Sequence, residues 1–419
     1  MKNIYLTYLG CKVNQYEIQL LKEKFEAADC RIVTNPEEAE ICIINTCSVT
    51  DKSDKKSKRM IEKIMRLNSK ADIVVCGCCV DNEFSLIHSI RGPRHFVLNK
   101  DKLNIPDLIG LNVNESIKGI TNFSRRGRGF VKIQDGCDNY CSYCIVAYTR
   151  GKAQSRRQED IVTEIKNLIA NGYREIVLTG INIGYYGKDI NSSLLELLEK
   201  VSKIDNLGRL RLSSLNPDDI NLDLIKHIKN NSKICKHFHI SIQSADTQIL
   251  KMMNRKYTGE YLVETLEKIK KEIPSAGLSG DFICGFPQET DSNFKQTLNL
   301  INSFDFIRAH IFTYSDREKT TAFKFSCKIS HKIKKERSKA LKIAAFKSAG
   351  RYIDKFINQE LEILVEYGID TKTQMHCGYS DTYIKTLVKD LPNSFKGQLI
   401  RVKALKNVEN QVISCLKLP

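Results

Sequence analysis

Three cysteines, Cys137, Cys141 and Cys144, constrain this chain more than any other feature. They directly follow an apolar run that starts at Phe130 and is typical of a strand. Thiolates are the usual ligands of iron–sulfur clusters, and a four-iron cluster held by only three of them leaves one iron free to bind another molecule. Structural zinc is the alternative, but it needs four ligands, and no fourth Cys or His lies close in the sequence. The spacing therefore predicts a cluster-binding loop with one open iron.

Composition places this loop in an intracellular setting. The chain has 419 residues, 15 cysteines and no secretory signal, which argues against a disulfide framework and for reduced thiols that serve metals. No apolar run approaches membrane-spanning length, so we expect a soluble, cytoplasmic protein without a membrane partner. The formal net charge of +17 favours a polyanionic partner such as nucleic acid, although a generally lysine-rich composition would give the same charge.

A second group of cysteines follows a repeated strand-to-helix pattern in residues 1–115. Predicted strands at 2–8, 41–44 and 73–75 lead to Cys11, Cys47 and Cys78. Alternating strands and helices indicate an α/β domain with a parallel sheet, in which ligands collect beyond the carboxyl ends of the strands. These three cysteines should therefore converge. Cys79 is an alternative third ligand, and we prefer Cys78 because it follows Gly77, which permits close backbone approach.

The middle of the chain repeats the same alternation. A basic linker at 116–129, which contains Arg125–Gly129, separates it from the first domain. Residues 130–328 carry six short apolar strands, near 130, 176, 210, 238, 280 and 309, with amphipathic stretches between them. This pattern predicts a partial (β/α)6 barrel, whose functional residues should lie in the loops after the strands.

Two smaller elements complete the chain. Residues 329–358 include a predicted helix, His331–Asn358, with an apolar stripe and a one-signed basic face. That face could contact phosphates or could simply be solvated; it comprises Lys332, Lys334, Lys335, Arg337, Lys339, Lys342, Lys347, Arg351 and Lys355. Residues 359–419 carry short strands with turns between them, which suggests a small β-barrel of a kind that often binds RNA.

The motifs resemble a known family. Cys137–Cys144 is similar to the cluster loop of the radical S-adenosylmethionine superfamily, and the other motifs narrow the resemblance to its methylthiotransferases. Those motifs are Leu9–Gln15, Asn45–Cys47, Gly77–Cys78, Leu178–Asn182, Arg211–Ser214, Ser241–Ser244, Met253–Thr258, Asp281–Pro287 and Phe312–Glu318. The Lys12–Gln15 form and the Arg211–Ser214 run look most like the enzymes that methylthiolate threonylcarbamoyladenosine beside the anticodon of tRNA. The tail resembles a TRAM domain, an RNA-binding module.

The resemblance implies two 4Fe-4S clusters, one on Cys137, Cys141 and Cys144 and one on Cys11, Cys47 and Cys78, together with S-adenosylmethionine. It also implies an electron donor of the flavodoxin or ferredoxin type and leaves the sulfur donor open. The expected cofactor contacts are Tyr143, Thr179, Gly180, Asn182, Ser241 and Gln243. Alternative substrates are isopentenyladenosine in tRNA and an aspartate of a ribosomal protein. A non-enzymatic RNA-binding zinc protein is the alternative from another class.

Several polar residues remain open. Arg156, Arg255 and Arg317 could contact a cofactor carboxylate, RNA phosphate or a surface ion pair. We expect His237 and His239 to face opposite sides of a strand and assign neither a role. No residue is assigned as a catalytic acid or base.

Overall fold

The amino-terminal sheet is parallel, with the strand order β2-β1-β3-β4-β5. Its strands are β1 (Asn3–Tyr8), β2 (Arg31–Val33), β3 (Ile41–Thr46), β4 (Asp72–Gly77) and β5 (His95–Val97). Side chains alternate between the two faces, so α1 (Lys12–Ala27) packs on one face and α2 (Asp51–Leu67) on the other. The three predicted strands are confirmed; the short edge strands β2 and β5 carried too little apolar pattern to be predicted.

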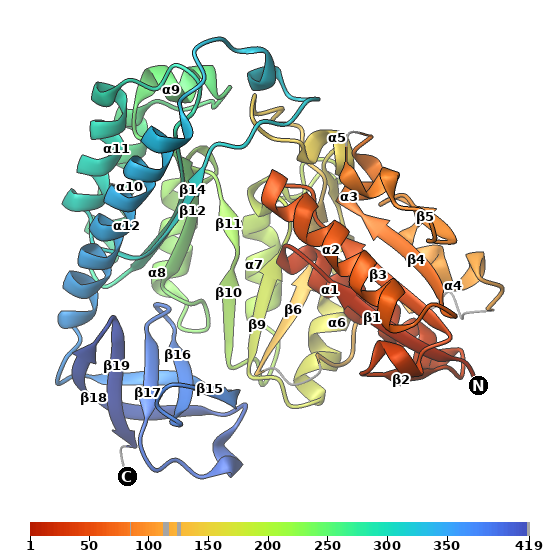
Figure 1. Cartoon of the computed structure of the whole chain (residues 1–419). Helices are drawn as coiled ribbons and strands as arrows, with labels where there is room; N and C mark the ends of the chain where they lie inside the picture. The colour runs from red at the N-terminus through yellow and green to blue at the C-terminus, as the bar shows by residue number, and fades with distance from the viewer. Residues whose placement is uncertain (84, 112–116, 124–126, 417–419) are drawn as a thin grey trace.

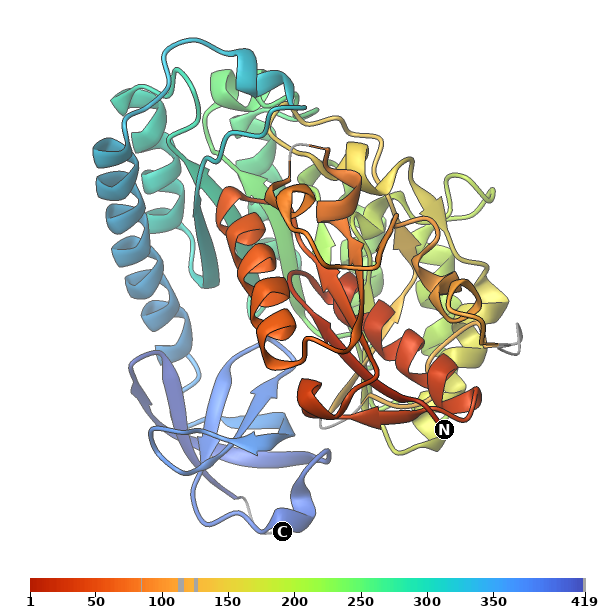
Figure 2. The same cartoon turned by 45° about the vertical axis from the view of Figure 1, so that its right-hand side comes forward.

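This computed structural model describes residues 1–83, 85–111, 117–123 and 127–416. Within these residues, no helix combines the length and apolar character needed to cross a bilayer. Figure 1 shows the amino-terminal sheet beside the central strands, with the carboxy-terminal barrel at their lower end. Figure 2 shows the same arrangement after a turn of the molecule.

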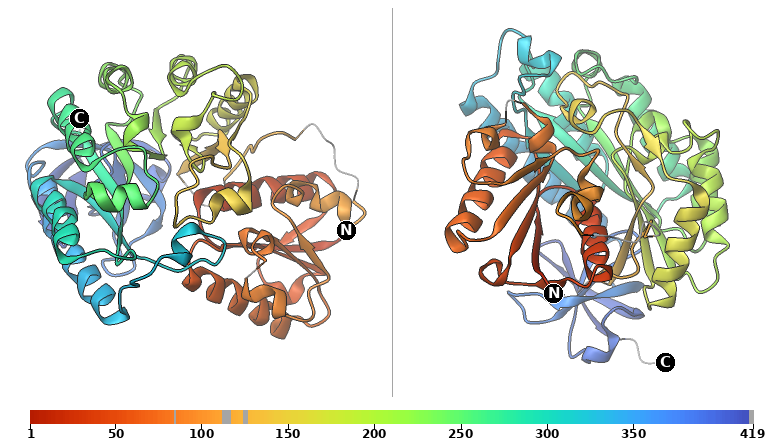
Figure 3. Two further views of the ribbon diagram at one scale, coloured as in Figure 1. Left: turned by 90° about the horizontal axis from the view of Figure 1, so that it is seen from above. Right: turned by 90° about the vertical axis from the view of Figure 1, so that its right-hand side faces the viewer.

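The central strands form an arc of two adjoining parallel sheets. One has the order β6-β9-β10, and the other has the order β11-β12-β13-β14. Only Ser213 separates β10 from β11, so the two sheets continue one another. The arc is visible from above in the left view of Figure 3. Its strands are β6 (Arg128–Lys132), β9 (Glu175–Thr179), β10 (Arg209–Leu212), β11 (Ser214–Leu215), β12 (His237–Gln243), β13 (Gly277–Cys284) and β14 (Phe306–Thr313).

If β10 and β11 are counted as one interrupted strand, helices lie between consecutive strands of this arc, which confirms the predicted partial (β/α)6 barrel. They are α6 (Gln158–Ala170), α7 (Leu194–Ser202), α8 (Leu222–Asn230), α9 (Thr247–Met252), α10 (Gly259–Glu272) and α11 (Asp291–Ser303). Strand β6 begins at Arg128, so Arg128 and Gly129 belong to the sheet rather than to the predicted linker. Arg125 and Arg126 lie outside the described residues.

The basic helix α12 (His331–Asp354) ends four residues before the predicted Asn358, which has a positive φ of 67°. Leu341, Tyr352 and Ile353 are buried as the apolar stripe predicts. Its basic face was overestimated, because Arg337 is buried and forms ion pairs with Glu289 and Asp291.

The carboxy-terminal strands close into a barrel in the order β15-β16-β17-β19-β18. They are β15 (Glu360–Ile369), β16 (His376–Ser380), β17 (Lys385–Val388), β18 (Leu399–Val408) and β19 (Gln411–Leu416). The sequence pattern missed β16. Arg209 and Arg211 on β10 bind this barrel, donating to the carbonyl oxygens of Tyr379 and Ser380 at 2.6 and 2.8 Å.

Candidate active site

The Cys137–Cys144 loop follows β6 and the short strand β7 (Gln134–Asp135), at the carboxyl end of the central sheet. Ser142 fixes it through both its backbone and its side chain. Its N–H donates to the Met253 carbonyl at 3.0 Å and its Oγ to the Met252 carbonyl at 2.7 Å. The N–H of Ala322 donates to the Ser142 carbonyl at 2.7 Å. The loop is thus held from two sides by hydrogen bonds within the protein.

The three thiols of this loop line one cavity of about 270 Å³. Burial, and then the neighbouring Cys141 thiolate, raise the pKa of Cys144 to about 12. Burial also raises the pKa of Cys137. Three thiols that share one cavity fit a site completed by a cationic metal centre, which deprotonates its ligands.

Four of the six predicted cofactor contacts line the same cavity: Tyr143, Asn182, Ser241 and Gln243. The Asn182 side chain is buried, and its Nδ2 has no hydrogen-bond partner among the described residues. An unpaired buried amide nitrogen on a residue that lines a cavity fits a polar ligand. The structure does not bring Thr179 and Gly180 here, because they end β9 beside a second cavity.

Arg255 is the cation of this cavity. Its Nη1 donates to Cys141 Sγ at 3.3 Å, and its Nη2 donates to Asn216 Oδ1 at 2.6 Å and to the Ser241 carbonyl at 3.0 Å. The sequence singled out Arg255 without a fixed partner and missed Asn216, whose only signal was its place directly after β11. Together they tie the cysteine loop to two strand ends.

The second thiol group lies where β1, β3 and β4 end side by side. Cys11 precedes α1, Cys47 follows β3, and Cys78 begins the short helix α3 (Cys78–Asp81). Asn14 joins the first two loops, because its Nδ2 donates to the carbonyls of Leu9 and Thr46 at 2.7 and 2.9 Å. The parallel register of the sheet therefore brings together residues far apart in sequence.

Two glycines allow this convergence. A Cβ on Gly10 would lie 2.8 Å from Cys47 Sγ, and one on Gly77 would lie 2.3 Å from Asn45 Oδ1. Both residues also have positive φ angles, of 99° and 91°, which favour glycine. A larger residue at either position would push the cysteine loops apart.

Cys79 points away from the other two thiols. Its Sγ donates to the Cys47 carbonyl at 3.2 Å and to Asp54 Oδ1 at 3.3 Å, and its side chain is part of the core beneath α2. Burial raises its pKa to about 12. By contrast, Cys78 is electrostatically coupled to both Cys11 and Cys47, as expected for neighbouring thiols.

A buried charge network stands behind Cys11. Glu17, fully buried on α1, pairs with Lys132 at 3.0 Å and Arg150 at 3.2 Å, and also with Lys102. Burial would raise the pKa of Glu17, but these cations hold it well below its usual range. The network joins the amino-terminal sheet to the central barrel and fixes how the two thiol groups lie relative to each other.

Two arginines left open by the sequence have internal partners. Arg156 pairs with the buried Glu164 at 2.6 Å. Arg317 donates to Asp54 Oδ2 at 2.6 Å and to Ser48 Oγ at 2.7 Å. Arg317 is therefore a link between the segment after β14 and the amino-terminal sheet.

The expectation for His237 and His239 was wrong. Residues two apart in a strand share a face, and both histidines line the second cavity. There His239 Nε2 lies 3.3 Å from Asp281 Oδ2, and His310 completes a group whose ligand atoms all lie within 4.8 Å. Asp281 and Phe312 line both cavities, so the two adjoin.

Family comparisons agree with this division of the chain. The profile described as "Radical SAM superfamily" matches residues 131–301. The profile described as "Uncharacterized protein family UPF0004" matches residues 3–98. The first contains the Cys137 loop and the central strands, and the second contains Cys11, Cys47 and Cys78.

Solved structures share the fold at low sequence identity. The radical S-adenosylmethionine methyltransferase TsrM from Kitasatospora setae aligns over 77% of each chain with a TM-score of 0.55 and 13% identity. The cobalamin-dependent radical enzyme OxsB aligns over 85% of this chain and 56% of its own, with a TM-score of 0.53 and 12% identity. These matches confirm the fold alone.

Curated relatives align over almost the whole chain. "Threonylcarbamoyladenosine tRNA methylthiotransferase MtaB" of Thermotoga maritima is 36% identical over 99% of this chain and 97% of its own. The protein of the same name from Bacillus subtilis is 34% identical over 95% and 92%. "tRNA-2-methylthio-N(6)-dimethylallyladenosine synthase" of Bacillus anthracis is 33% identical over 96% and 83%. With its two family segments in the same order and its central fold shared, this chain belongs to the radical S-adenosylmethionine tRNA methylthiotransferases.

Proposed function

We propose that this enzyme replaces the C2 hydrogen of N6-threonylcarbamoyladenosine, beside the anticodon of tRNA, with a methylthio group. One observation carries the proposal: the cavity of Cys137, Cys141 and Cys144 adjoins a second cavity that Cys11 lines. A base held between them could meet both thiol groups. The relatives named for threonylcarbamoyladenosine support this substrate over dimethylallyladenosine.

The chemistry of the substrate explains why ordinary side chains would not suffice. The C2–H bond of adenine is strong and has no proton acidic enough for a side-chain base. S-adenosylmethionine and a 4Fe-4S cluster, the cofactors of the radical superfamily, supply one-electron chemistry that can remove such a hydrogen. The hydrogen would leave in 5′-deoxyadenosine, and a C–S bond would take its place. A second S-adenosylmethionine would provide the methyl group.

The residues around the first cavity would bind and orient these cofactors. Cys137, Cys141 and Cys144 would hold the radical cluster. A hydroxylated, zwitterionic cofactor can be bound by Ser241 and Gln243, which lie at the carboxyl end of β12, and by the unpaired amide nitrogen of Asn182. The Arg255 guanidinium suits the cofactor carboxylate, and Tyr143 offers a partly buried ring for its adenine.

The second thiol group would hold a second 4Fe-4S cluster that provides the sulfur. The place of Cys11, Cys47 and Cys78 at three adjacent strand ends supports this ligand set, as does the hydrogen bond that directs Cys79 toward Asp54. Three ligands again leave an iron open. The reductant would be of the flavodoxin or ferredoxin type, and the sulfur source is open.

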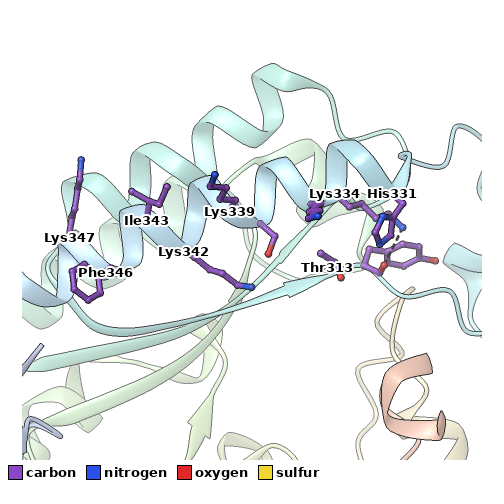
Figure 4. A pocket seen from close by; sticks show the side chains of 11 residues that line it. Thr313, His331, Lys334, Lys339, Lys342, Ile343, Phe346 and Lys347 are labelled. Atoms are coloured by element: carbon purple, nitrogen blue, oxygen red, sulfur yellow. Dashed lines mark hydrogen bonds between the residues drawn. The ribbon is translucent and has the colours of Figure 1, made fainter. Parts of the chain in front are cut away.

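Two surfaces would bind the rest of the tRNA. A tRNA substrate would make this a cytoplasmic enzyme. One is the α12 groove, a hollow of about 730 Å³ where Lys339, Lys342 and Lys347 surround the exposed Ile343 and Phe346 (Figure 4). Lysines there can neutralise phosphates, and the aromatic ring can stack on a base. The other is the carboxy-terminal barrel, residues 359–419, in the role of a TRAM domain.

The test is an anaerobic reaction of the iron- and sulfide-reconstituted protein with tRNA, S-adenosylmethionine and a strong reductant. Nucleoside mass spectrometry should detect 2-methylthio-N6-threonylcarbamoyladenosine, and iron analysis should give about eight iron per chain. Parallel reactions contain tRNA with dimethylallyladenosine, or the ribosomal protein. Product from either of these and none from the first tRNA contradicts the proposal, and so does a colourless protein with zinc and no iron.

A further inference from the structure

The second cavity, of about 410 Å³, has the size of a small-ligand site, and the proposed function leaves open what its charged wall binds. Its lining residues come from the central strands, from the start of α1 and from the carboxy-terminal barrel. Helix α1 contributes its first residue, Lys12, while β10 contributes Arg211 and β14 contributes Arg308. Tyr383, from the loop between β16 and β17, closes the lower end. Four separate parts of the chain therefore meet around one opening.

Two of its three cations lack a counterion. Arg211 pairs with Glu175 at 2.8 Å. In the part of the chain that the structure describes, no carboxylate oxygen lies within 4.0 Å of the Lys12 ammonium or the Arg308 guanidinium. Asp281 is the one carboxylate in the described wall, and it already contacts His239. Unpaired cations beside a cavity are costly unless an anion binds there.

The phenol of Tyr383 lies in the positive potential of these cations. Tyr383 stacks on His237 at 4.8 Å, while Arg211 and Arg308 lie 4.7 and 5.1 Å from the centre of its ring. Burial raises the pKa of Tyr383, but Arg128, Lys12 and Arg211 outweigh burial and lower it to about 8. A phenol that ionises this readily marks a place that favours negative charge.

We propose that Lys12 and Arg308 bind the carboxylate of the N6 substituent and thereby select an acidic adenosine substituent over an apolar one. The inference rests on the proposed function. A threonine joined through its nitrogen to a carbamoyl group keeps its carboxylate, whereas a dimethylallyl group has none. Cys11 lines the same cavity next to Lys12, so a base whose substituent reaches these cations lies beside the second thiol group.

Other anions fit this cavity less well. The carboxylate of S-adenosylmethionine has Arg255 in the first cavity, where the Cys137 loop lies and where neither Lys12 nor Arg308 contributes to the wall. Backbone phosphates of tRNA have the exposed lysines of the α12 groove. The test must nevertheless separate all three anions.

The test is a charge-by-charge cycle in equilibrium binding. The reconstituted enzyme is titrated with two anticodon stem-loop RNAs that differ only in the N6 substituent, threonylcarbamoyl or its neutral carboxamide. Wild type should bind the carboxylate RNA more tightly. Arg308→Gln and Lys12→Met should each reduce this preference about tenfold or more, because each removes a charge-assisted contact. Arg308→Lys should restore part of it.

A matched control is Lys342→Met in the α12 groove, which should weaken both RNAs by the same factor. Equal weakening of both RNAs by the Lys12 and Arg308 variants would show phosphate binding or damage to the fold and overturns the inference. Weaker binding of S-adenosylmethionine alone overturns it as well. If the carboxylate preference exists but no methylthio product forms, the proposed function fails and the pocket stands; product without any preference gives the reverse.

Discussion

The two thiol groups reach the same arrangement by opposite routes. Cys137, Cys141 and Cys144 lie in a single loop, held by the turn at Met252 and Met253. The other group comes from three strand ends and depends on the parallel register of β1, β3 and β4. A local motif needs only its loop, whereas the scattered group needs the whole sheet to fold first. Damage to the amino-terminal sheet should therefore affect only the second group.

Their surroundings differ as well. The loop faces a cavity with Arg255 and the unpaired amide nitrogen of Asn182, which suits a zwitterionic cofactor. Cys11 faces the cavity of Lys12 and Arg308, which suits an anionic substrate group. The comparison indicates that, of the two adjoining cavities, the first suits the cofactor and the second suits the base that is modified.

The largest expected effect comes from removing the loop thiols. Replacing Cys137, Cys141 and Cys144 together by Ala should abolish formation of 5′-deoxyadenosine under strong reductant, because no ligand set for the radical cluster remains. Iron should fall from about eight to about four per chain. Chromatography of the reaction products measures the first and a colorimetric assay the second. Persistent deoxyadenosine in this variant would rule out the assignment.

The corresponding change in the scattered group should separate the two activities. Replacing Cys11, Cys47 and Cys78 by Ala should again halve the iron, but deoxyadenosine should still form while the methylthio nucleoside is lost. The loop variant is the matched control, since it loses the same number of thiols. Methylthiolated tRNA from the scattered-group variant would refute a sulfur-providing role for that group.

The sequence predicted the cysteines of the first thiol group better than it predicted the other residues that line their cavity. The spacing of Cys137–Cys144 and the strand-to-helix repeats predicted the loop, the two sheets and the convergence of Cys11, Cys47 and Cys78. Thr179 and Gly180 line the second cavity rather than the first, so their contact with the cofactor stays a prediction. A residue at the end of β9 can face either of two adjoining cavities. Only the curvature of the sheet decides which one.

Long-range charge pairing was equally hidden. In the sequence, Arg337 looks like the exposed basic residues beside it on α12, yet it is buried in an ion pair with Glu289. Arg317 pairs with Asp54 from a segment far away in the sequence. The cationic cavity could not be foreseen either, since Tyr383 reaches it from a separate barrel and strand β16 carried too weak a pattern to place it.

A finer comparison is between adjacent thiols. Cys78→Ala should lose the second cluster and about half of the iron, whereas Cys79→Ala should keep both, because the Cys79 thiol is bonded to Asp54 and the Cys47 carbonyl. Cys79→Ala should instead cost about 1 kcal/mol of stability, as expected for a buried hydrogen-bonded group. Iron content and thermal unfolding measure the two. The opposite pattern would make Cys79 the ligand.

The next prediction concerns the contact between the segment after β14 and the amino-terminal domain. Arg317→Met leaves Asp54 buried without its partner and should lower the free energy of unfolding by about 3 kcal/mol. Arg351→Met is the matched control, because the Arg351–Asp305 pair is exposed and should contribute less than about 1 kcal/mol. Denaturant unfolding of both variants measures the difference. Equal losses would mean that the Arg317–Asp54 pair does not stabilise the contact between the segment after β14 and the amino-terminal sheet.

The smallest expected effect concerns the positive potential of the second cavity and whether the first cavity shares it. Tyr383 ionises with a pKa of about 8, below its ordinary value of 10.0, because of the cations around it. The phenol is neutral below that pH and a phenolate above it, so a rise from pH 7 to pH 9 adds a competing anion beside Arg308. The groups that face it are Lys12, Arg128, Arg211, Arg308, His237 and Tyr379.

Binding of the threonylcarbamoyl RNA, relative to the carboxamide RNA, should therefore weaken on the order of fivefold between these pH values. Tyr383→Phe, which keeps the ring and cannot ionise, should remove this weakening. Cleavage of S-adenosylmethionine without RNA should show no such dependence on Tyr383, because the Cys137 cavity does not include it. If Tyr383→Phe also changed the pH profile of cleavage, the two sides would share one electrostatic environment, and the division between cofactor side and substrate side would not hold.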